Sequence, residues 1–421
     1  MNRKPDVLIV GAGIAGLTAA RDLCLMGLKV TLLEARDRIG GRILTHHTPE
    51  FPVELGAEFV HGRPPDLWHL LQEAKMPLAE LEGISWYHER GTWARADGMM
   101  PEFGEVFGAM ADKQPDQSFQ QYLETVDAGE EAKDHALRFI EGFHAADPQR
   151  VSVHWLVRSN QAEEEIQGDR QYRTVTGYDT LVQFIAGQLP KENCELRLNT
   201  VVEEVRWTSG SIIVKTNAGE FESPRVLITV PIALLKSGTI RFSPELPHKQ
   251  KALAYLEMGP VVRVILCFGA KFWEGRLKDL SFMFTDDEQF PTWWASHPLP
   301  FPILTGWAAG SYARKLSGLD HNQIIECALQ SLERILGIHH AELRQHFKAG
   351  FTHDWQADPF SQGAYSYAVA GGSNAPQELA APVADTLFFA GEATDPNGHN
   401  GTVHGAISSG HRAAREILAT V

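Results

Sequence analysis

A glycine-rich turn between an apolar run and a helical stretch constrains the N-terminus of this chain. Val7 to Val10 is typical of a buried strand, and Gly11, Gly13 and Gly16 follow it directly in the pattern G-x-G-x-x-G. These glycines allow a tight turn, a close approach of a pyrophosphate to the backbone, and close packing of helix on strand. The helix N-terminus offers unpaired N–H groups to phosphate. The pattern predicts a dinucleotide-binding β-α-β unit.

A second strand and an acid complete this unit. The helical stretch ends at Gly27, where a glycine tolerates a left-handed backbone, and Val30 to Leu33 reads as the next buried strand. Glu34 stands at the end of that strand, where an acid accepts hydrogen bonds from ribose hydroxyls. Because strand, turn, helix, strand and acid agree, an adenine dinucleotide explains the pattern better than a simple glycine-rich turn.

Two glycines and three cations follow the acid. Gly40 and Gly41 let a second loop approach a ligand, and the arginines at positions 36, 38 and 42 provide forks that match a diphosphate. A basic surface turn is the alternative reading. It would not explain the glycine pair, nor the related pattern near the C-terminus.

The C-terminal pattern again combines a strand, a glycine loop and a helix. Leu387 to Ala390 is apolar and ends in Gly391 and Glu392, and after the loop small or apolar residues recur at helical spacing from Val403 to Ile417. A helix starting near Thr402 directs its N-terminal N–H groups at whatever lies before it. An electron-poor ring that becomes anionic on reduction would be stabilised there.

These N-terminal and C-terminal patterns resemble those of the flavin-containing amine oxidases. That family includes monoamine, polyamine and L-amino-acid oxidases and histone-lysine demethylases. The resemblance covers nearly the whole chain. It is nearest to polyamine oxidases and demethylases, which carry G-A-x-x-x-H-G and T-V-H-G-A where this chain has Gly56 to Gly62 and Thr402 to Ala406. Other matching segments are Val53 to Leu55, Gly177-Tyr178 with Leu181, Val226 to Pro231, Leu235 to Pro244, Lys271 to Trp273, Trp355, Asp358 to Phe360 and Gly363 to Tyr367.

The resemblance implies an α/β fold of two interleaved domains, and 421 residues are too many for one core. A Rossmann-like FAD-binding domain is expected from residues 1–75, 172–240 and 384–421. A substrate-binding domain of a sheet backed by helices is expected from 76–171 and 241–383. Strand-like runs at 196–205, 212–215, 226–230, 261–268, 281–284 and 303–309 fit this division, as do helical stretches at 119–123, 135–143 and 324–336.

The cofactor implied by the resemblance is non-covalent FAD, because Ala364 stands where monoamine oxidases attach the flavin through a cysteine. The chemistry comes from the flavin, and the protein must bind and orient it. The residues expected to contact it are Gly11, Gly13, Ile14, Ala15, Gly16, Glu34, Ala35, Arg36, Gly40, Gly41, Arg42, Gly56, Ala57, Glu58, Val202, Trp355, Gly391, Glu392, Gly401, Thr402 and Val403.

Four residues are candidates for the reaction site. Tyr365 matches one of the two aromatic walls that flank the substrate nitrogen in the family, and Gly363 beside it favours this over a core aromatic. Thr402 takes the place of the second wall. Arg263 takes the place of the family's lysine, which holds a water against flavin N5; pairing with a carboxylate at a domain interface is an equal alternative. His61 matches a histidine near the flavin in polyamine oxidases, which would tune a substrate amine near neutral pH; a loop histidine bonded to backbone is its alternative.

Composition limits the partners. The net charge of −15 and the lack of basic runs argue against nucleic acid, and no apolar run reaches membrane-spanning length. Four scattered cysteines suggest reduced thiols, and the first strand begins too early for a signal peptide, so we expect a cytoplasmic monomer or homodimer. His399, His404 and His411 straddle the glycine loop and the helix with no cysteine or paired acid nearby, so no metal site is expected.

These observations lead to an oxidoreductase: FAD-dependent oxidation of a primary or secondary amine. The family transfers a hydride equivalent from the α-carbon to flavin N5, the imine hydrolyses, and oxygen or another acceptor takes the electrons, with oxygen giving hydrogen peroxide. Because an arginine at position 263 puts oxygen reactivity in doubt, an FAD-dependent desaturase or dehydrogenase of a non-amine is the first alternative. A non-enzymatic flavoprotein or demethylase-like binding subunit is the second.

Overall fold

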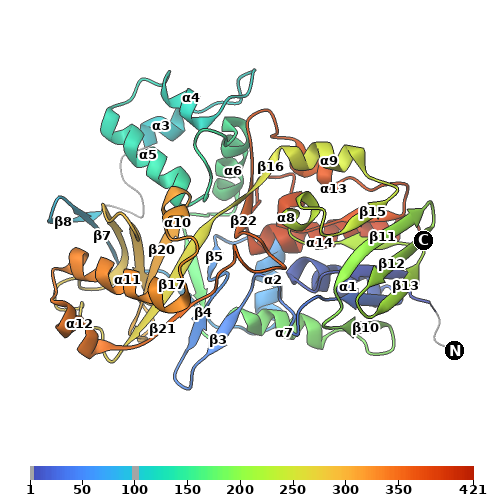
Figure 1. Cartoon of the computed structure of the whole chain (residues 1–421), viewed down its shortest axis with the longest axis horizontal. Coiled ribbons are helices and arrows are strands. Elements are labelled where there is room, and N and C mark those ends of the chain that lie inside the picture. Colours follow the sequence, from blue (N-terminus) through green and yellow to red (C-terminus); the bar gives the residue numbers. More distant parts are fainter. Residues whose placement is uncertain (1–3, 97–103) are drawn as a thin grey trace.

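A five-stranded parallel sheet lies at the centre of one half of the molecule, on the right of Figure 1. In this computed structural model, which describes residues 4–96 and 104–421, the strand order is β10-β2-β1-β14-β23. Every neighbouring pair in that order is parallel. The strands are β1 (Val7–Val10), β2 (Val30–Leu33), β10 (Cys194–Arg197), β14 (Val226–Ile228) and β23 (Leu387–Phe389).

Both faces of the parallel sheet are covered, as its continuous apolar strands require. Val7 and Ile9 of β1 pack with helices, whereas Leu8 and Val10 pack with a second sheet of order β13-β12-β11-β15. The helices are α1 (Ile14–Leu25), α2 (Pro65–Glu73), α7 (Asp179–Gly187) and α14 (Val403–Leu418). The second sheet contains β11 (Val202–Thr208), β12 (Ser211–Thr216), β13 (Gly219–Ser223) and β15 (Arg241–Ser243).

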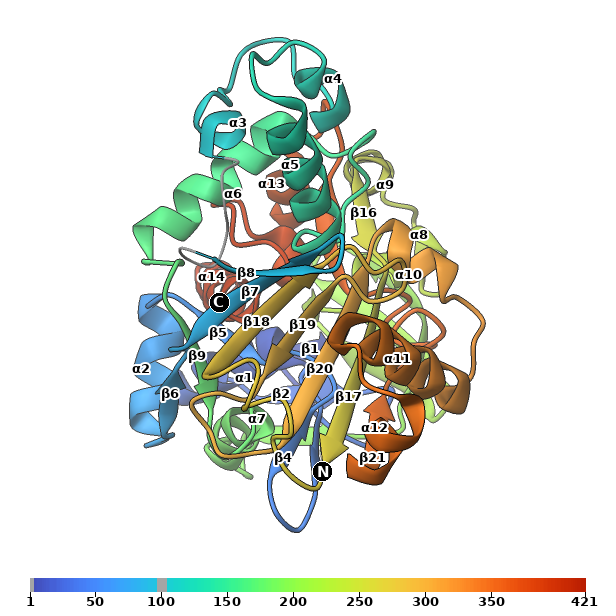
Figure 2. The same ribbon diagram turned by 90° about the vertical axis from the view of Figure 1, so that its left-hand side faces the viewer.

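A seven-stranded sheet organises the other half, and Figure 2 shows most of its strands side by side. Its order is β21-β17-β20-β19-β18-β7-β8. The strands are β7 (Ile84–Glu89), β8 (Thr92–Ala96), β17 (Val261–Phe268), β18 (Leu280–Thr285), β19 (Thr292–Ala295), β20 (Ile303–Ala309) and β21 (Phe347–Thr352). Its core includes side chains of α11 (His321–Leu336) and α12 (His340–His346), and α10 (Ser311–Lys315) follows β20.

A cluster of helices occupies the top of Figure 1 and has a hydrophobic core of its own. Its helices are α3 (Gly104–Gly108), α4 (Phe119–Leu123), α5 (Glu130–Gly142) and α6 (Val153–Glu165), and its core also takes side chains from α8 (Ile232–Lys236), α9 (Pro247–Ala254) and α13 (Ala375–Ala380). The smaller sheets pair β16 (Leu256–Gly259) with β22 (Tyr365–Ala368), β3 (Thr45–His47) with β4 (Pro52–Glu54), and β5 (Phe59–His61) and β6 (Leu78–Glu80) with β9 (Gln171–Thr174).

The observed architecture confirms the expected two-domain α/β fold. The strands of the parallel sheet come from residues 1–75, 172–240 and 384–421, and those of the seven-stranded sheet from 76–171 and 241–383. The apolar run at 196–205 is two strands in different sheets rather than one, because Asn199 has a left-handed backbone (φ 54°) and redirects the chain. Within residues 4–96 and 104–421, no helix has both the length and the apolar character needed to cross a membrane.

Candidate active site

A cavity of about 500 Å³ lies between the parallel sheet and the seven-stranded sheet. The glycine turn after β1 and the end of β2 form one side of it. The other side is rich in aromatic side chains from the second half: Tyr87, Phe282, Phe284, Trp294, Trp307 and Tyr312. The volume falls in the usual range of ligand and cofactor sites. One chamber therefore joins the predicted dinucleotide turn to an apolar compartment.

The glycine turn has the shape that a diphosphate needs. A Cβ on Gly16 would collide with the carbonyl oxygen of Gly11, so this position serves the packing of α1 on the turn. A Cβ on Gly13 would have Cα of Gly41, 4.0 Å away, as its nearest neighbour. Gly13 and Gly41 both line the cavity. Because the N-cap of α1 is itself a glycine, capping of the first N–H groups is left to a ligand. These residues fit FAD.

Glu34 is fixed at the cavity wall by the backbone. Its carboxylate accepts hydrogen bonds from the N–H groups of Ala12 at 2.7 Å and Arg36 at 3.0 Å, and the residue is 6% exposed. The acid thereby ties the glycine turn to the loop after β2. Of the other residues expected at the cofactor, those that also line the cavity include Gly11, Ile14, Ala15, Ala35, Gly40, Gly56, Ala57, Glu58, Val202, Trp355, Gly391, Gly401, Thr402 and Val403.

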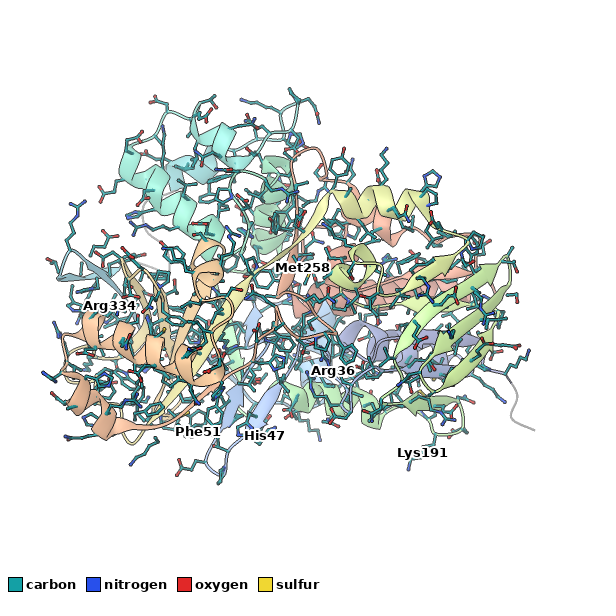
Figure 3. The ribbon with its side chains drawn as sticks, in the orientation of Figure 1. Arg36, His47, Phe51, Lys191, Met258 and Arg334 are labelled. Atoms are coloured by element: carbon teal, nitrogen blue, oxygen red, sulfur yellow. The ribbon has the colours of Figure 1, made fainter. Side chains whose placement is uncertain are left out.

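The arginines after Glu34 are engaged with protein groups. Arg36, at the centre of the molecule in Figure 3, forms a bidentate pair with Asp358 at 2.9 and 2.8 Å. Arg38 donates to backbone carbonyls, including that of Gly41 at 3.0 Å. Arg42 donates to the carbonyl of Ala364 and to Glu392. These bonds hold the loop in place, and Arg36 and Arg42, as well as Gly41, also line the cavity.

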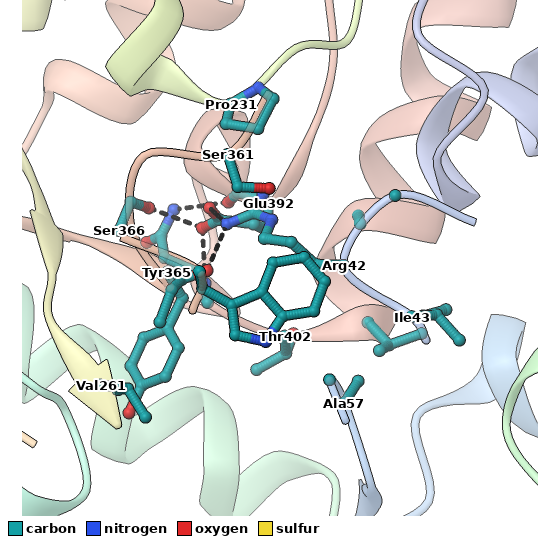
Figure 4. A pocket seen from close by; sticks show the side chains of 18 of the residues that line it. Arg42, Ile43, Ala57, Pro231, Val261, Ser361, Tyr365, Ser366, Glu392 and Thr402 are labelled. Carbon is teal, nitrogen blue, oxygen red and sulfur yellow. Dashed lines mark hydrogen bonds and ion pairs between the residues drawn. The ribbon is translucent and has the colours of Figure 1, made fainter. Parts of the chain in front are cut away.

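Glu392 connects three segments beneath the cavity. Its carboxylate accepts from Arg42 at 2.9 Å, from the Ser366 hydroxyl at 2.6 Å and from the Gly401 N–H at 2.8 Å. Figure 4 shows Arg42, Ser366 and Glu392 meeting at one point of the pocket. Glu392 therefore fixes the loop that precedes α14 rather than presenting a free carboxylate.

Tyr365 and Thr402 lie together in this pocket, as the resemblance implied (Figure 4). The Tyr365 hydroxyl donates to the carbonyl of Phe143 at 2.6 Å, and burial raises its pKa, so it stays protonated. The Thr402 hydroxyl accepts from the Gly405 N–H at 2.9 Å and donates to the carbonyl of His399 at 2.7 Å. Thr402 is thus the N-cap of α14, a role that aims the helix N-terminus at the cavity.

Arg263 belongs to a buried ionic network. Its guanidinium pairs with Glu58, donates to the carbonyl of Gly56 at 2.5 Å and lies over the ring of Trp294. Arg173 of β9 holds the other carboxylate oxygen of Glu58 at 2.6 Å. The side chains of both arginines and of Glu58 are at most 11% exposed. Although burial alone would raise the pKa of Glu58, the charges of Arg263 and Arg173 hold it below its ordinary value. Arg263 therefore pairs with a carboxylate, as the alternative interpretation of this residue predicted.

His61 is a neutral imidazole in this structure. Burial lowers its pKa to about 4, because water is excluded and the imidazolium is disfavoured. Its Nδ1 finds no hydrogen-bond partner within the described part of the chain. The side chain lines the cavity, and its lowered pKa argues against a charged His61 that would tune a substrate amine near neutral pH.

The structure brings an acid from another helix beside two of the C-terminal histidines. Glu163 of α6 lies beside His399 and His404, and one ligand atom of each lies within 4.8 Å of the others. His411 points elsewhere and pairs with Asp22 at 2.5 Å. Spacing along the chain does not reveal a partner that arrives from a helix more than two hundred residues away.

The sequence did not single out Arg173 or the aromatic side of the cavity. Arg173 sits in the buried strand β9, and the argument applied to Arg263, that a cation on a buried strand needs a partner, would have singled it out. The aromatic residues carried no such signal, because strand aromatics are as common in cores as in pockets. Only the pairing of β18, β19 and β20 places Phe282, Trp294 and Trp307 on one wall.

Bound flavin should be released by acid or heat, at about one FAD per chain. Ala364 lines the cavity with a methyl group, and no cysteine of the described chain lines it. Precipitation with acid followed by absorbance of supernatant and pellet checks the expectation. Yellow colour retained in the pellet would contradict it.

Comparison with known proteins agrees with this geometry. The family model described as flavin containing amine oxidoreductase matches residues 14–418. Lysine-specific histone demethylase 1 homolog 1 of Arabidopsis thaliana is 30% identical over 464 residues, covering 98% of this chain and 52% of that protein. The chain thus spans about half the length of that relative. Polyamine oxidase 4 of Oryza sativa subsp. japonica is 27% identical over 451 residues, covering 98% and 88%.

Solved structures share the fold. Wild-type putrescine oxidase bound to putrescine superposes with a TM-score of 0.84 at 24% identity, over 99% of each chain. Cyclohexylamine oxidase from Brevibacterium oxydans gives a TM-score of 0.84 at 20% identity, again over 99% of each chain. None of these relatives supports the alternative of a non-amine desaturase.

Proposed function

Because this chain belongs to the flavin-containing amine oxidoreductases and is an FAD-dependent enzyme of the amine oxidase type, we propose that its cavity oxidises an aliphatic di- or polyamine. One observation carries the proposal: the dinucleotide turn and the aromatic compartment share a single chamber, with Tyr365 and Thr402 between them. When bound, FAD supplies the acceptor for a hydride equivalent from the substrate α-carbon. The relatives' names favour amines of this kind, and the net charge of −15 favours the approach of cations.

The chain's own residues would orient the amine and exclude water. Tyr365 is fixed by its hydrogen bond to Phe143, so its ring forms a rigid wall beside Gly401. The aromatic compartment disfavours a charged group and so favours the neutral amine at the reacting carbon. The N-terminus of α14, held by the Thr402 cap, places its positive dipole end where negative charge develops on the reduced cofactor.

An amine panel tests the substrate class. We expect putrescine or spermidine to be consumed with hydrogen peroxide formed in a one-to-one ratio, measured by a peroxidase-coupled assay, and monoamines of similar length to react more slowly. Equal or faster turnover of monoamines would contradict the di- or polyamine assignment. We further propose a cytoplasmic enzyme, monomeric or homodimeric, since all four cysteines are free thiols.

Arg263 is expected to limit the reaction of the reduced enzyme with oxygen. Its fork fills the cavity wall between Glu58 and Trp294, whereas a lysine would keep the charge and leave room for a water. Arg263→Lys should therefore raise the rate of reoxidation by oxygen several-fold, as measured by rapid mixing of reduced enzyme with aerated buffer. Arg173→Lys is the matched control, because Arg173 holds the same carboxylate without lining the large cavity among the described residues. Equal rates in Arg263→Lys and the parent enzyme would overturn the role.

A further inference from the structure

Three metal-ligating side chains from two distant segments meet beside the cavity. Glu163 comes from α6, His399 from the loop before α14, and His404 from the first turn of α14. Nδ1 of His399 and Nε2 of His404 share a hydrogen bond of 3.1 Å, whose proton a metal ion bound by both nitrogens would displace. His404 is 4% exposed, whereas Glu163 lines the cavity. The cluster is therefore anchored in the protein on one side and open to the chamber on the other.

The spacing of the two imidazole nitrogens suits a transition-metal ion. A tetrahedral zinc ion with Zn–N bonds of about 2.0–2.1 Å separates two imidazole nitrogens by roughly 3.3 Å, close to the spacing already present. Each of the three residues also offers one ligand atom within 4.8 Å of the other two.

Glu163 has the properties of a carboxylate that lacks its cation. Its carboxylate makes no hydrogen bond or ion pair with any residue in 4–96 or 104–421. By contrast, Glu34, Glu58 and Glu392, which also line the cavity, each accept hydrogen bonds from protein groups, and Glu89 pairs with Arg138 at 3.4 Å. Glu163 is the cavity acid, among those described, that remains available to a ligand.

We propose that Glu163, His399 and His404 form a binding site for one Zn²⁺ ion per chain, with the remaining coordination position open to the cavity. Two histidines, one glutamate and a water are a common zinc ligand set. A second cluster of Glu89, Glu131 and His135 meets the same spacing, but Arg138 pairs with Glu89 and its charge opposes a cation there. The proposal is restricted to the first cluster.

Zinc at this position would affect the chamber. A dication beside Glu163 repels alkylammonium groups, so the KM for a cationic amine should rise when zinc is bound. This consequence rests on the proposed function. Zinc binding itself does not, and a binding measurement separates the two: an enzyme that binds zinc but oxidises no amine would refute only the function.

Equilibrium dialysis of EDTA-treated holoenzyme against Zn²⁺, with metal analysis of both compartments, tests the site. We expect one zinc per chain in the parent enzyme. Glu163→Gln and His404→Gln should each weaken binding by at least about tenfold, since loss of even an outer-shell partner costs about 10–100-fold in metal affinity. His135→Gln, which removes a ligand of the second cluster, should bind zinc like the parent.

A second measurement guards against misfolding of the variants. Co²⁺ in place of Zn²⁺ should give the visible d–d absorption of a low-coordinate site in the parent, and Glu163→Gln, which leaves α14 intact, should lose it while retaining FAD. Absence of stoichiometric zinc in the parent enzyme would overturn the proposal. So would equal binding by the parent and Glu163→Gln, or loss of binding in His135→Gln alone.

Discussion

Gly13→Val is expected to yield a folded protein without FAD. The added side chain would point into open space beside Gly41, so it meets no protein atom closer than 4.0 Å at Cβ, yet it occupies the path of the diphosphate to the backbone. Purified protein should show flavin occupancy near zero after gel filtration, with circular dichroism like that of FAD-stripped parent enzyme.

The control for this prediction is Gly187→Val. A Cβ at Gly187 also meets nothing within 4 Å, but this glycine ends α7, and the cavity lining does not include it. This variant should keep its flavin. Full occupancy in Gly13→Val after dialysis would show that the glycine turn does not contact the cofactor.

Glu58→Gln is expected to destabilise the protein by about 3–5 kcal/mol, the range for removing one partner from a buried ion pair. The substitution leaves Arg173 and Arg263 facing each other without the carboxylate, with side chains only 6% and 5% exposed. Nε of Arg263 and one terminal nitrogen of Arg173 already lack partners among the described residues, so there is little to replace the lost bonds. Urea unfolding monitored by tryptophan fluorescence measures the change.

Glu220→Gln provides the comparison for that experiment. Glu220 pairs with Arg206 on the surface, where the two side chains are 51% and 41% exposed, and such pairs contribute about 0–1 kcal/mol. A loss in Glu58→Gln no larger than in Glu220→Gln would mean that the network is hydrated and does not depend on its central carboxylate.

The fold could be predicted from the sequence because its strongest signals are local. The glycine turn, the strand that ends before Glu34 and the helix that begins after Thr402 were all predicted correctly from spacing, and together they locate the parallel sheet and one wall of the cavity. The prediction of one strand over 196–205 was wrong, because the chain turns at Asn199. The left-handed backbone of that residue cannot be inferred from the hydrophobic pattern.

The site was less predictable because its contacts join segments far apart in sequence. The sequence predicted that Arg263 lies on a buried strand. It could not show whether the guanidinium faces the flavin or pairs with an acid, because that depends on where Glu58 lies. His61 was placed at the cavity, whereas its lowered pKa depends on how completely its neighbours exclude water. The sequence gives no sign that Glu163 lies near His399 and His404, because more than two hundred residues separate them.

The central claim, that this cavity uses FAD to oxidise amines, is tested most directly by anaerobic mixing of the yellow holoenzyme with putrescine, spermidine and a set of monoamines. We expect at least one di- or polyamine to bleach the flavin absorbance completely, with one aldehyde formed per flavin. Flavin that stays oxidised with every amine, while dithionite reduces it normally, would contradict the account.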